Sequence, residues 1–154
     1  MMVCSQKGAL LFKKITSHNV DFAKLKTWEK GTQIYGKVLA GVTSHFYRSF
    51  LNYHASILSH SAKTVDEYFL DLRSFFRYLK VRRNPALAQT PFSEISILDV
   101  DLEFVSQTQL SEIYGFLTFL SGGAPAGKAE SSTRARKCAS IRSFYHYLCV
   151  HAHQ

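Results

Sequence analysis

The sequence predicts an all-α fold, and three observations support this class. Four separated stretches place apolar residues three and four positions apart, which is the spacing of one face of a helix. Residues that favour helix ends, such as serine, threonine and glycine, lie at the boundaries of these stretches. The 154 residues are 46% hydrophobic and 19% charged, which is typical of a globular chain that can form one domain with its own core.

The first clear helix is predicted from Val42 to about Ile57. Its apolar residues recur at intervals of four, four, three and four positions, as expected for an amphipathic helix of about four turns. They are Val42, Phe46, Phe50, Tyr53 and Ile57. The polar run at 59–61 ends this helix.

The second predicted helix begins at Thr64, where Thr64 and Glu67 match a capping box. Its apolar stripe contains seven residues, namely Val65, Tyr68, Phe69, Leu72, Phe75, Phe76 and Leu79. Cations at 80, 82 and 83 favour a helix end there, because they oppose the negative end of the helix dipole. Asn84 and Pro85 then start a long connection.

The connection to about Val105 is the least regular part of this half of the chain. Loose alternation from Ile95 to Leu102 predicts an extended segment, and the length of the connection suggests that a short helical turn lies within it. A third helix is predicted from about Gln107 to Leu120, with a stripe that begins at Leu110. Two glycines at 122–123 are expected to end it.

The fourth predicted helix extends from Ser131 to His151 and has a basic N-terminal part. Its apolar residues are Cys138, Ile141, Tyr145 and Leu148, and its cations are Arg134, Arg136, Lys137 and Arg142. It contains no acidic residue. Because a helix N-terminus already presents free N–H groups and partial positive charge, added arginines make it a good phosphate site. A solvated charged face on a core helix is the alternative interpretation.

The whole chain is strongly basic, with a net charge of +8. Such a charge favours a polyanionic partner, either nucleic acid or an anionic membrane face. Residues 1–40 show no consistent apolar period, so we predict there a less ordered basic N-terminal extension, or one or two short helices. One helical domain is predicted at 41–154. The extension either lies along a DNA backbone or is simply solvated.

Several other classes of protein are disfavoured. No apolar run is long enough to span a bilayer, and the first residues lack the apolar region of a secretory signal. The three cysteines form no even disulfide framework, so we expect a cytoplasmic protein. Cys149 and His153 are four residues apart, but strong zinc patterns have two such pairs, so no metal site is predicted. No phosphate-binding glycine loop is present, and neither a cofactor nor a small-molecule substrate is expected.

Three blocks of the sequence resemble the N-terminal core-binding domain of tyrosine recombinases, the family of phage integrases and Xer-like integrases. The blocks are KTVDEYFLDLRSFFRYLK, SEISILDVDLEFVSQTQLSEIYGFLTFL and TRARKCASIRSFYHYL. The resemblance covers about residues 42–151. It implies a small SAM-like bundle of four to five helices that clamps a recombination half-site in double-stranded DNA and self-associates on it.

The resemblance also implies residue roles. The second and fourth helices approach DNA in this family, so the expected DNA-binding residues are Lys63, Thr64, Arg73, Arg77, Arg134, Arg136 and Lys137. Asp71 and Arg142 also match frequent family positions. Both lie on inner parts of their helices, and we expect an ion pair between them.

No residue of this sequence is assigned a catalytic role. In the family, the nucleophilic tyrosine and its cationic partners come from a C-terminal domain, which we expect to be absent from this chain. A helical protein-interaction module whose basic face binds an acidic partner is the alternative function. A remnant of a truncated integrase is a further one.

Overall fold

The computed structural model describes residues 45–122 and 127–151, and every regular element within these ranges is helical. The five α-helices are α3 (His45–Asn52), α4 (Ala62–Arg83), α5 (Leu102–Ser106), α6 (Leu110–Gly122) and α7 (Ser131–His151). A π-helical segment, η2 (Tyr53–Ile57), extends α3, and two 3₁₀ turns, η3 (Pro85–Gln89) and η4 (Phe92–Glu94), follow α4. The small all-α bundle predicted from the sequence is confirmed. The predicted extension at 1–40 lies outside the described residues.

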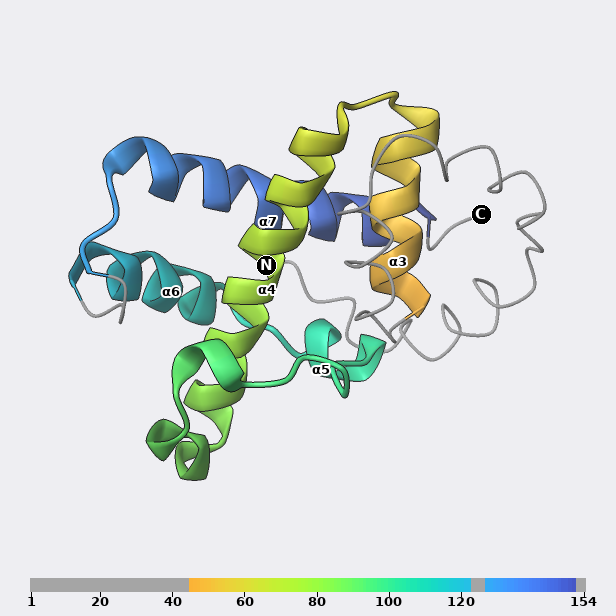
Figure 1. The fold of residues 1–154 in the computed structure, drawn as a ribbon. Helices are drawn as coiled ribbons and strands as arrows, with labels where there is room; N and C mark the ends of the chain where they lie inside the picture. The colour runs from red at the N-terminus through yellow and green to blue at the C-terminus, as the bar shows by residue number, and fades with distance from the viewer. Residues whose placement is uncertain (1–44, 123–126, 152–154) are drawn as a thin grey trace.

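The long helix α4 is the centre of the bundle. It crosses α7 and also packs against α3 and α6 (Figure 1). Aromatic side chains fill the space where three of these helices meet: the ring centroids of Phe50 and Phe144 are 5.3 Å apart, and those of Phe76 and Phe144 are 5.5 Å apart. All three rings are fully buried. Burial of such large apolar side chains supplies the main driving force for this packing.

The apolar stripe predicted for α4 is confirmed, but its predicted start is wrong. The helix begins at Ala62, and Ser61 is the N-cap, with its hydroxyl accepting a hydrogen bond from the Thr64 N–H at 3.2 Å. Thr64 is therefore within the first turn, so it cannot form the capping box with Glu67. Ser61 has the extended backbone that an N-cap requires, which the preceding polar run at 59–61 allows.

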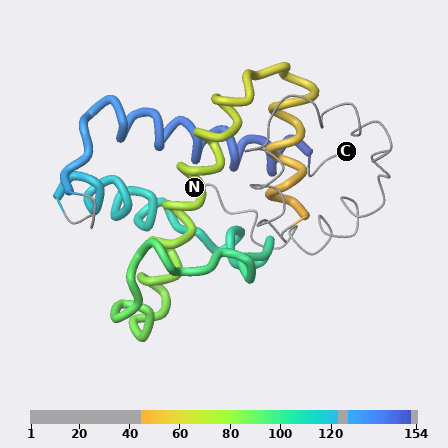
Figure 2. Tube along the Cα trace, in the orientation of Figure 1, coloured from red at the N-terminus to blue at the C-terminus, as the bar shows by residue number. Residues whose placement is uncertain are grey.

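The connection after α4 folds back along that helix, as the green part of the trace in Figure 2 shows. It contains no strand within the described residues, so the extended segment predicted at 95–102 is not part of a sheet; the two 3₁₀ turns and α5 are the helical turns expected in it. Ile95, Ile97 and Val100 are nonetheless buried. Lys80 fixes the segment to α4, because its ammonium donates to the Ser96 carbonyl at 2.8 Å and to the Asp99 carboxylate.

Helix α6 begins at Leu110, three residues after the predicted start. Leu110 itself is 53% exposed, so its place in the predicted core stripe is wrong. Leu110 is in the first turn of α6, where the helix has not yet reached the core. Phe116 and Leu120, further along the helix, are the residues of α6 that are buried in the core. The bounds predicted for the last helix, Ser131 to His151, are confirmed.

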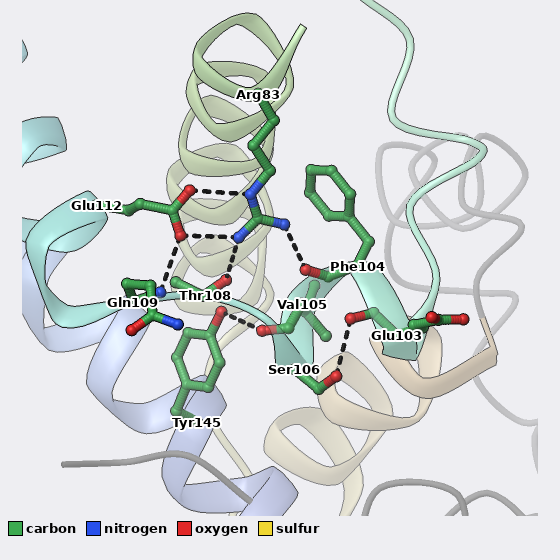
Figure 3. Close-up of polar contacts among 9 residues, drawn as sticks. All are labelled: Arg83, Glu103, Phe104, Val105, Ser106, Thr108, Gln109, Glu112 and Tyr145. Atoms are coloured by element: carbon green, nitrogen blue, oxygen red, sulfur yellow. Dashed lines mark hydrogen bonds and ion pairs between the residues drawn. The ribbon is translucent and has the colours of Figure 1, made fainter. Parts of the chain in front are cut away.

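Arg83, the last residue of α4, joins that helix to α5 and α6 (Figure 3). Its guanidinium makes a two-point ion pair with the Glu112 carboxylate, with distances of 2.9 Å from Nε and 2.8 Å from Nη2. Nη1 donates to the Phe104 carbonyl at 2.6 Å, and the group also lies over the Phe104 ring. Although burial opposes the change, hydrogen bonding to Arg83 helps to lower the pKa of Glu112. A planar guanidinium can satisfy all these partners at once.

Candidate nucleic-acid-binding surface

The predicted DNA-binding residues lie on the two helices that cross, α4 and α7. At the crossing, the fully buried carboxylate of Asp71 accepts hydrogen bonds from three groups of α7. Arg136 Nη1 is 2.6 Å from Oδ2, Lys137 Nζ is 3.0 Å from Oδ1, and the Ser140 hydroxyl is 2.8 Å from Oδ2. A buried carboxylate requires such partners, because removal from water strongly disfavours an unpaired charge.

The predicted ion pair between Asp71 and Arg142 is wrong. Asp71 is paired, as expected, with cations of α7, but these are Arg136 and Lys137. Arg142 is exposed on another face of α7. Positions 136, 137 and 140 lie on the side of α7 that contacts Asp71. Position 142 is two residues beyond 140, about 200° further around the helix, and therefore lies on another face.

Arg136 and Lys137 differ in how far they remain available to a ligand. The Arg136 side chain is 42% exposed although it contacts Asp71, whereas the Lys137 side chain is only 13% exposed. Arg136 therefore has donors that face solvent, since a guanidinium carries five N–H groups and one of them is used here. Lys137 acts mainly as the buried counter-charge of Asp71.

The N-terminal end of α4 carries two of the predicted residues. Lys63 is exposed on the first turn, and Thr64 is half-buried, with its hydroxyl 2.9 Å from that of Ser61. Lys63 can therefore reach an external anion directly, while Thr64 is partly occupied by the cap.

The remaining arginines are held by the protein itself. Arg73 lies over the Phe69 ring, with its central carbon 5.3 Å from the ring centroid. Arg77 donates from Nε to the Ile95 carbonyl at 2.8 Å, and Arg134 donates from Nη1 to the Ala129 carbonyl at 2.7 Å. Each of these contacts uses one part of the guanidinium and fixes the orientation of the rest. The sequence alone showed none of these internal partners.

The crossing keeps an excess of positive charge. Helix α7 has four cations and no acidic residue, and α4 has six cations and three acidic residues. The single carboxylate of Asp71 balances one of its two cationic partners, so Arg136 and Lys137 together still contribute one net positive charge. Burial is the main cause that lowers the pKa of Arg77, and the positive charge of the nearby Arg73 lowers it further.

Two structural residues were missed or misinterpreted in the sequence. Ser140 was not singled out, although a serine among apolar residues on the inner face of α7 is a signal for a buried hydrogen bond. For Arg83 the sequence indicates either a cation that opposes the helix dipole or a DNA contact, and not an ion pair with a distant residue. Its partner Glu112 lies 29 positions further along the chain, and the pairing of such distant charges requires knowledge of the packing.

The chain is 42% identical over 103 residues to a tyrosine recombinase XerC of Caldanaerobacter subterraneus subsp. tengcongensis. The match covers 64% of this chain and 27% of that relative, so it spans about a quarter of the relative's length. No protein-family profile matches the chain, and no solved structure matches it.

Identity at this level over 103 residues reflects common ancestry with a site-specific recombinase. The matched 103 residues are therefore similar to a limited part of a tyrosine recombinase. None of the described helices is long and apolar enough to cross a membrane.

Proposed function

We propose that residues 41–154 form the core-binding domain of a site-specific tyrosine recombinase, which clamps a recombination half-site in double-stranded DNA. The observation that carries this proposal is the 42% identity to a tyrosine recombinase. The all-α bundle and the basic crossing of α4 and α7 support it. Strand cleavage is then the task of residues outside the matched segment, and self-association on DNA belongs to the same proposal.

The contacts proposed are mainly with phosphates, which position a protein on the duplex without reading its sequence. Lys63 and Arg136 are the strongest candidates, because both expose their charged groups. Arg73 and Arg134 are half-buried and are held in fixed orientations by internal contacts, so they can contribute with little further loss of side-chain freedom. Thr64 and Lys137 are less available, since each is engaged within the protein, and Arg77 is held at its Nε by the Ile95 carbonyl.

The proposal is tested by duplex binding at two salt concentrations, measured by fluorescence anisotropy with the whole 154-residue chain. Phosphate contacts release condensed counterions, so the affinity should fall steeply as salt is raised. The double variant K63Q/R136Q should weaken binding and reduce the slope of log affinity against log salt by about two, because two DNA phosphates are no longer neutralised.

A matched control is R82Q, because Arg82 is exposed at the far end of α4 from Lys63. It removes one positive charge but none of the proposed contacts, so it should change the slope by much less than the double variant. Equal slopes for R82Q and K63Q/R136Q would contradict the proposed surface, as would duplex binding that does not depend on salt.

A basic face that serves an acidic protein is the competing function. An acidic polypeptide added as a competitor separates the two: a nucleic-acid surface should retain duplex in the presence of polyglutamate at equal charge concentration. Complete displacement by polyglutamate would favour the protein-interaction module.

A further inference from the structure

A cavity with cationic side chains lies beside the proposed DNA surface, and neither Lys63 nor Arg136 lines it. A half-open cavity of about 930 Å³ is bounded by α4, the turns η3 and η4, α6 and the start of α7. It is next to the crossing but is lined largely by different side chains. Nothing in the proposed DNA contacts requires it.

The cavity combines an apolar part with positive charge. Its apolar part includes Phe92 and Phe119, whose ring centroids are 5.6 Å apart and whose side chains are only partly buried. Its polar part includes Arg77, Lys128 and Lys137. Among the described residues that line it, none is acidic. Lys137 is paired with the buried Asp71, whereas Arg77 and Lys128 have no carboxylate partner among the described residues.

Arg77 has the most informative environment of the three. Its Nε is bound to the Ile95 carbonyl, which fixes the plane of the guanidinium at the wall of the cavity. Its two terminal amino groups have no hydrogen-bond partner among the described residues. Such a guanidinium is held in place by one nitrogen and has two free amino groups. It can bind an anion with little further loss of side-chain conformational entropy, because its orientation is already fixed.

We propose that this cavity binds an aromatic phosphate. The phosphate would be held by the terminal amino groups of Arg77 and by Lys128, with hydroxyl donors from Ser74 and Thr133 also on the cavity wall. A phosphate fits better than a carboxylate, since it has more acceptor oxygens for this number of donors. The flat ring would lie against Phe92 and Phe119, where stacked or edge-on contacts are favourable.

The probe for this site is 1-naphthyl phosphate, and its binding to the whole chain is measured by isothermal titration calorimetry. Inorganic phosphate and 1-naphthol test the two halves of the ligand separately, and each should bind at least about tenfold more weakly than the complete probe. Inorganic phosphate binding as tightly as 1-naphthyl phosphate would overturn the proposal, as would the absence of binding at millimolar concentration.

The variant R77Q removes the charge and should weaken binding of the probe by about tenfold or more, since it abolishes hydrogen bonds between charged groups. The control R82Q removes an equal charge from the exposed surface of the same helix, outside the cavity lining. It should change binding by less than about twofold, because exposed distant charges are screened by salt. An equal loss in R77Q and R82Q would overturn the proposal.

A second variant protects the test against misfolding of R77Q. Ala88 lines the cavity and is exposed, so A88W fills the space without entering the core. Loss of probe binding by A88W at unchanged melting temperature supports the cavity as the site. Unchanged probe binding by a folded A88W overturns it.

Two sources of an aromatic phosphate are separated by competition. Displacement of the probe by thymidine monophosphate but not by oligothymidylate supports a free small ligand. Displacement by both supports a nucleotide of a DNA strand. The site is independent of the proposed phosphate contacts, so K63Q/R136Q should leave probe binding intact even where duplex binding fails. A parallel loss of probe binding in K63Q/R136Q overturns a separate site.

Discussion

Asp71 and Arg136 are 65 positions apart in the sequence, yet Arg136 Nη1 lies 2.6 Å from Asp71 Oδ2. This contact joins the middle of α4 to the first half of α7 and places a cation at the edge of the proposed DNA surface. Since Asp71 is fully buried, it accepts its partners in a region of low dielectric, where the interaction is stronger than on the surface. The pair therefore connects the stability of the bundle to the orientation of Arg136.

The substitution D71N tests this connection. Asparagine keeps the shape of the side chain but removes the negative charge. The ammonium of Lys137, which is largely buried, then has no counter-charge from residue 71. We expect a loss of about 2–3 kcal/mol in the free energy of unfolding, measured by urea denaturation at neutral pH.

The matched control is D99N. Asp99 also pairs with a lysine, but its side chain is 69% exposed. Exposed pairs contribute about 1 kcal/mol or less, so D99N should be nearly silent. Equal effects of the two variants would mean that the carboxylate of Asp71 is no more important than a surface charge.

The substitution R83K tests the contacts shown in Figure 3. Lysine keeps the positive charge but cannot bind both oxygens of Glu112 while also reaching the Phe104 carbonyl, because it lacks the planar fork. We expect a loss of about 1–3 kcal/mol in unfolding free energy. The same change at the exposed Arg82 should have an effect within about 0.5 kcal/mol, and comparable losses at both positions would refute the specific role of Arg83.

Much of this architecture could be predicted from the sequence, because helix periodicity is a local property. The stripe of α4 and both ends of α7 follow from residue spacing alone. The partner of Asp71 could not be predicted, since Arg136, Lys137 and Arg142 all lie on the same basic helix and the rotation of that helix selects among them. The internal contacts of Arg77 and Arg83 likewise depend on how the connection at 84–109 folds back along α4.

His54 gives the stability of the bundle a dependence on pH. Its side chain is buried, with Nδ1 3.1 Å from Nδ1 of His60 and Nε2 3.2 Å from the Ser143 hydroxyl. Burial, and secondarily the charge of His60, lower the pKa of His54 from 6.5 to about 4. The unfolded chain therefore binds a proton more readily than the folded one between these pH values, and stability falls as the pH decreases through this window.

The expected loss between pH 7 and pH 4 that is due to His54 is on the order of 3 kcal/mol. It is measured as the difference between wild type and H54Q in urea denaturation at a series of pH values, since glutamine does not titrate. H146Q is the control, because His146 is exposed. A wild-type pH profile in H54Q would show that another group causes the loss.

Tyr78 of α4 lies so close to Gly115 of α6 that there is no room for a larger residue at position 115. A methyl group added at Gly115 would collide with the hydroxyl oxygen of Tyr78, whereas the next nearest atom, the ring carbon that carries this hydroxyl, is at an ordinary 3.6 Å. The Tyr78 ring also contacts Phe116 and Phe119, which limits its freedom to move aside. We therefore expect G115A to destabilise the protein by about 1–3 kcal/mol, measured by urea denaturation.

The background Y78F should reverse the sign of this effect. Phenylalanine removes the hydroxyl that causes the collision, and alanine is favoured over glycine within a helix by up to about 1 kcal/mol. G115A introduced into Y78F should therefore be neutral or stabilising by up to about 1 kcal/mol, relative to Y78F alone. A double-mutant cycle measures this coupling directly. If G115A destabilises both backgrounds equally, the Tyr78 hydroxyl is not the group that requires glycine at this position.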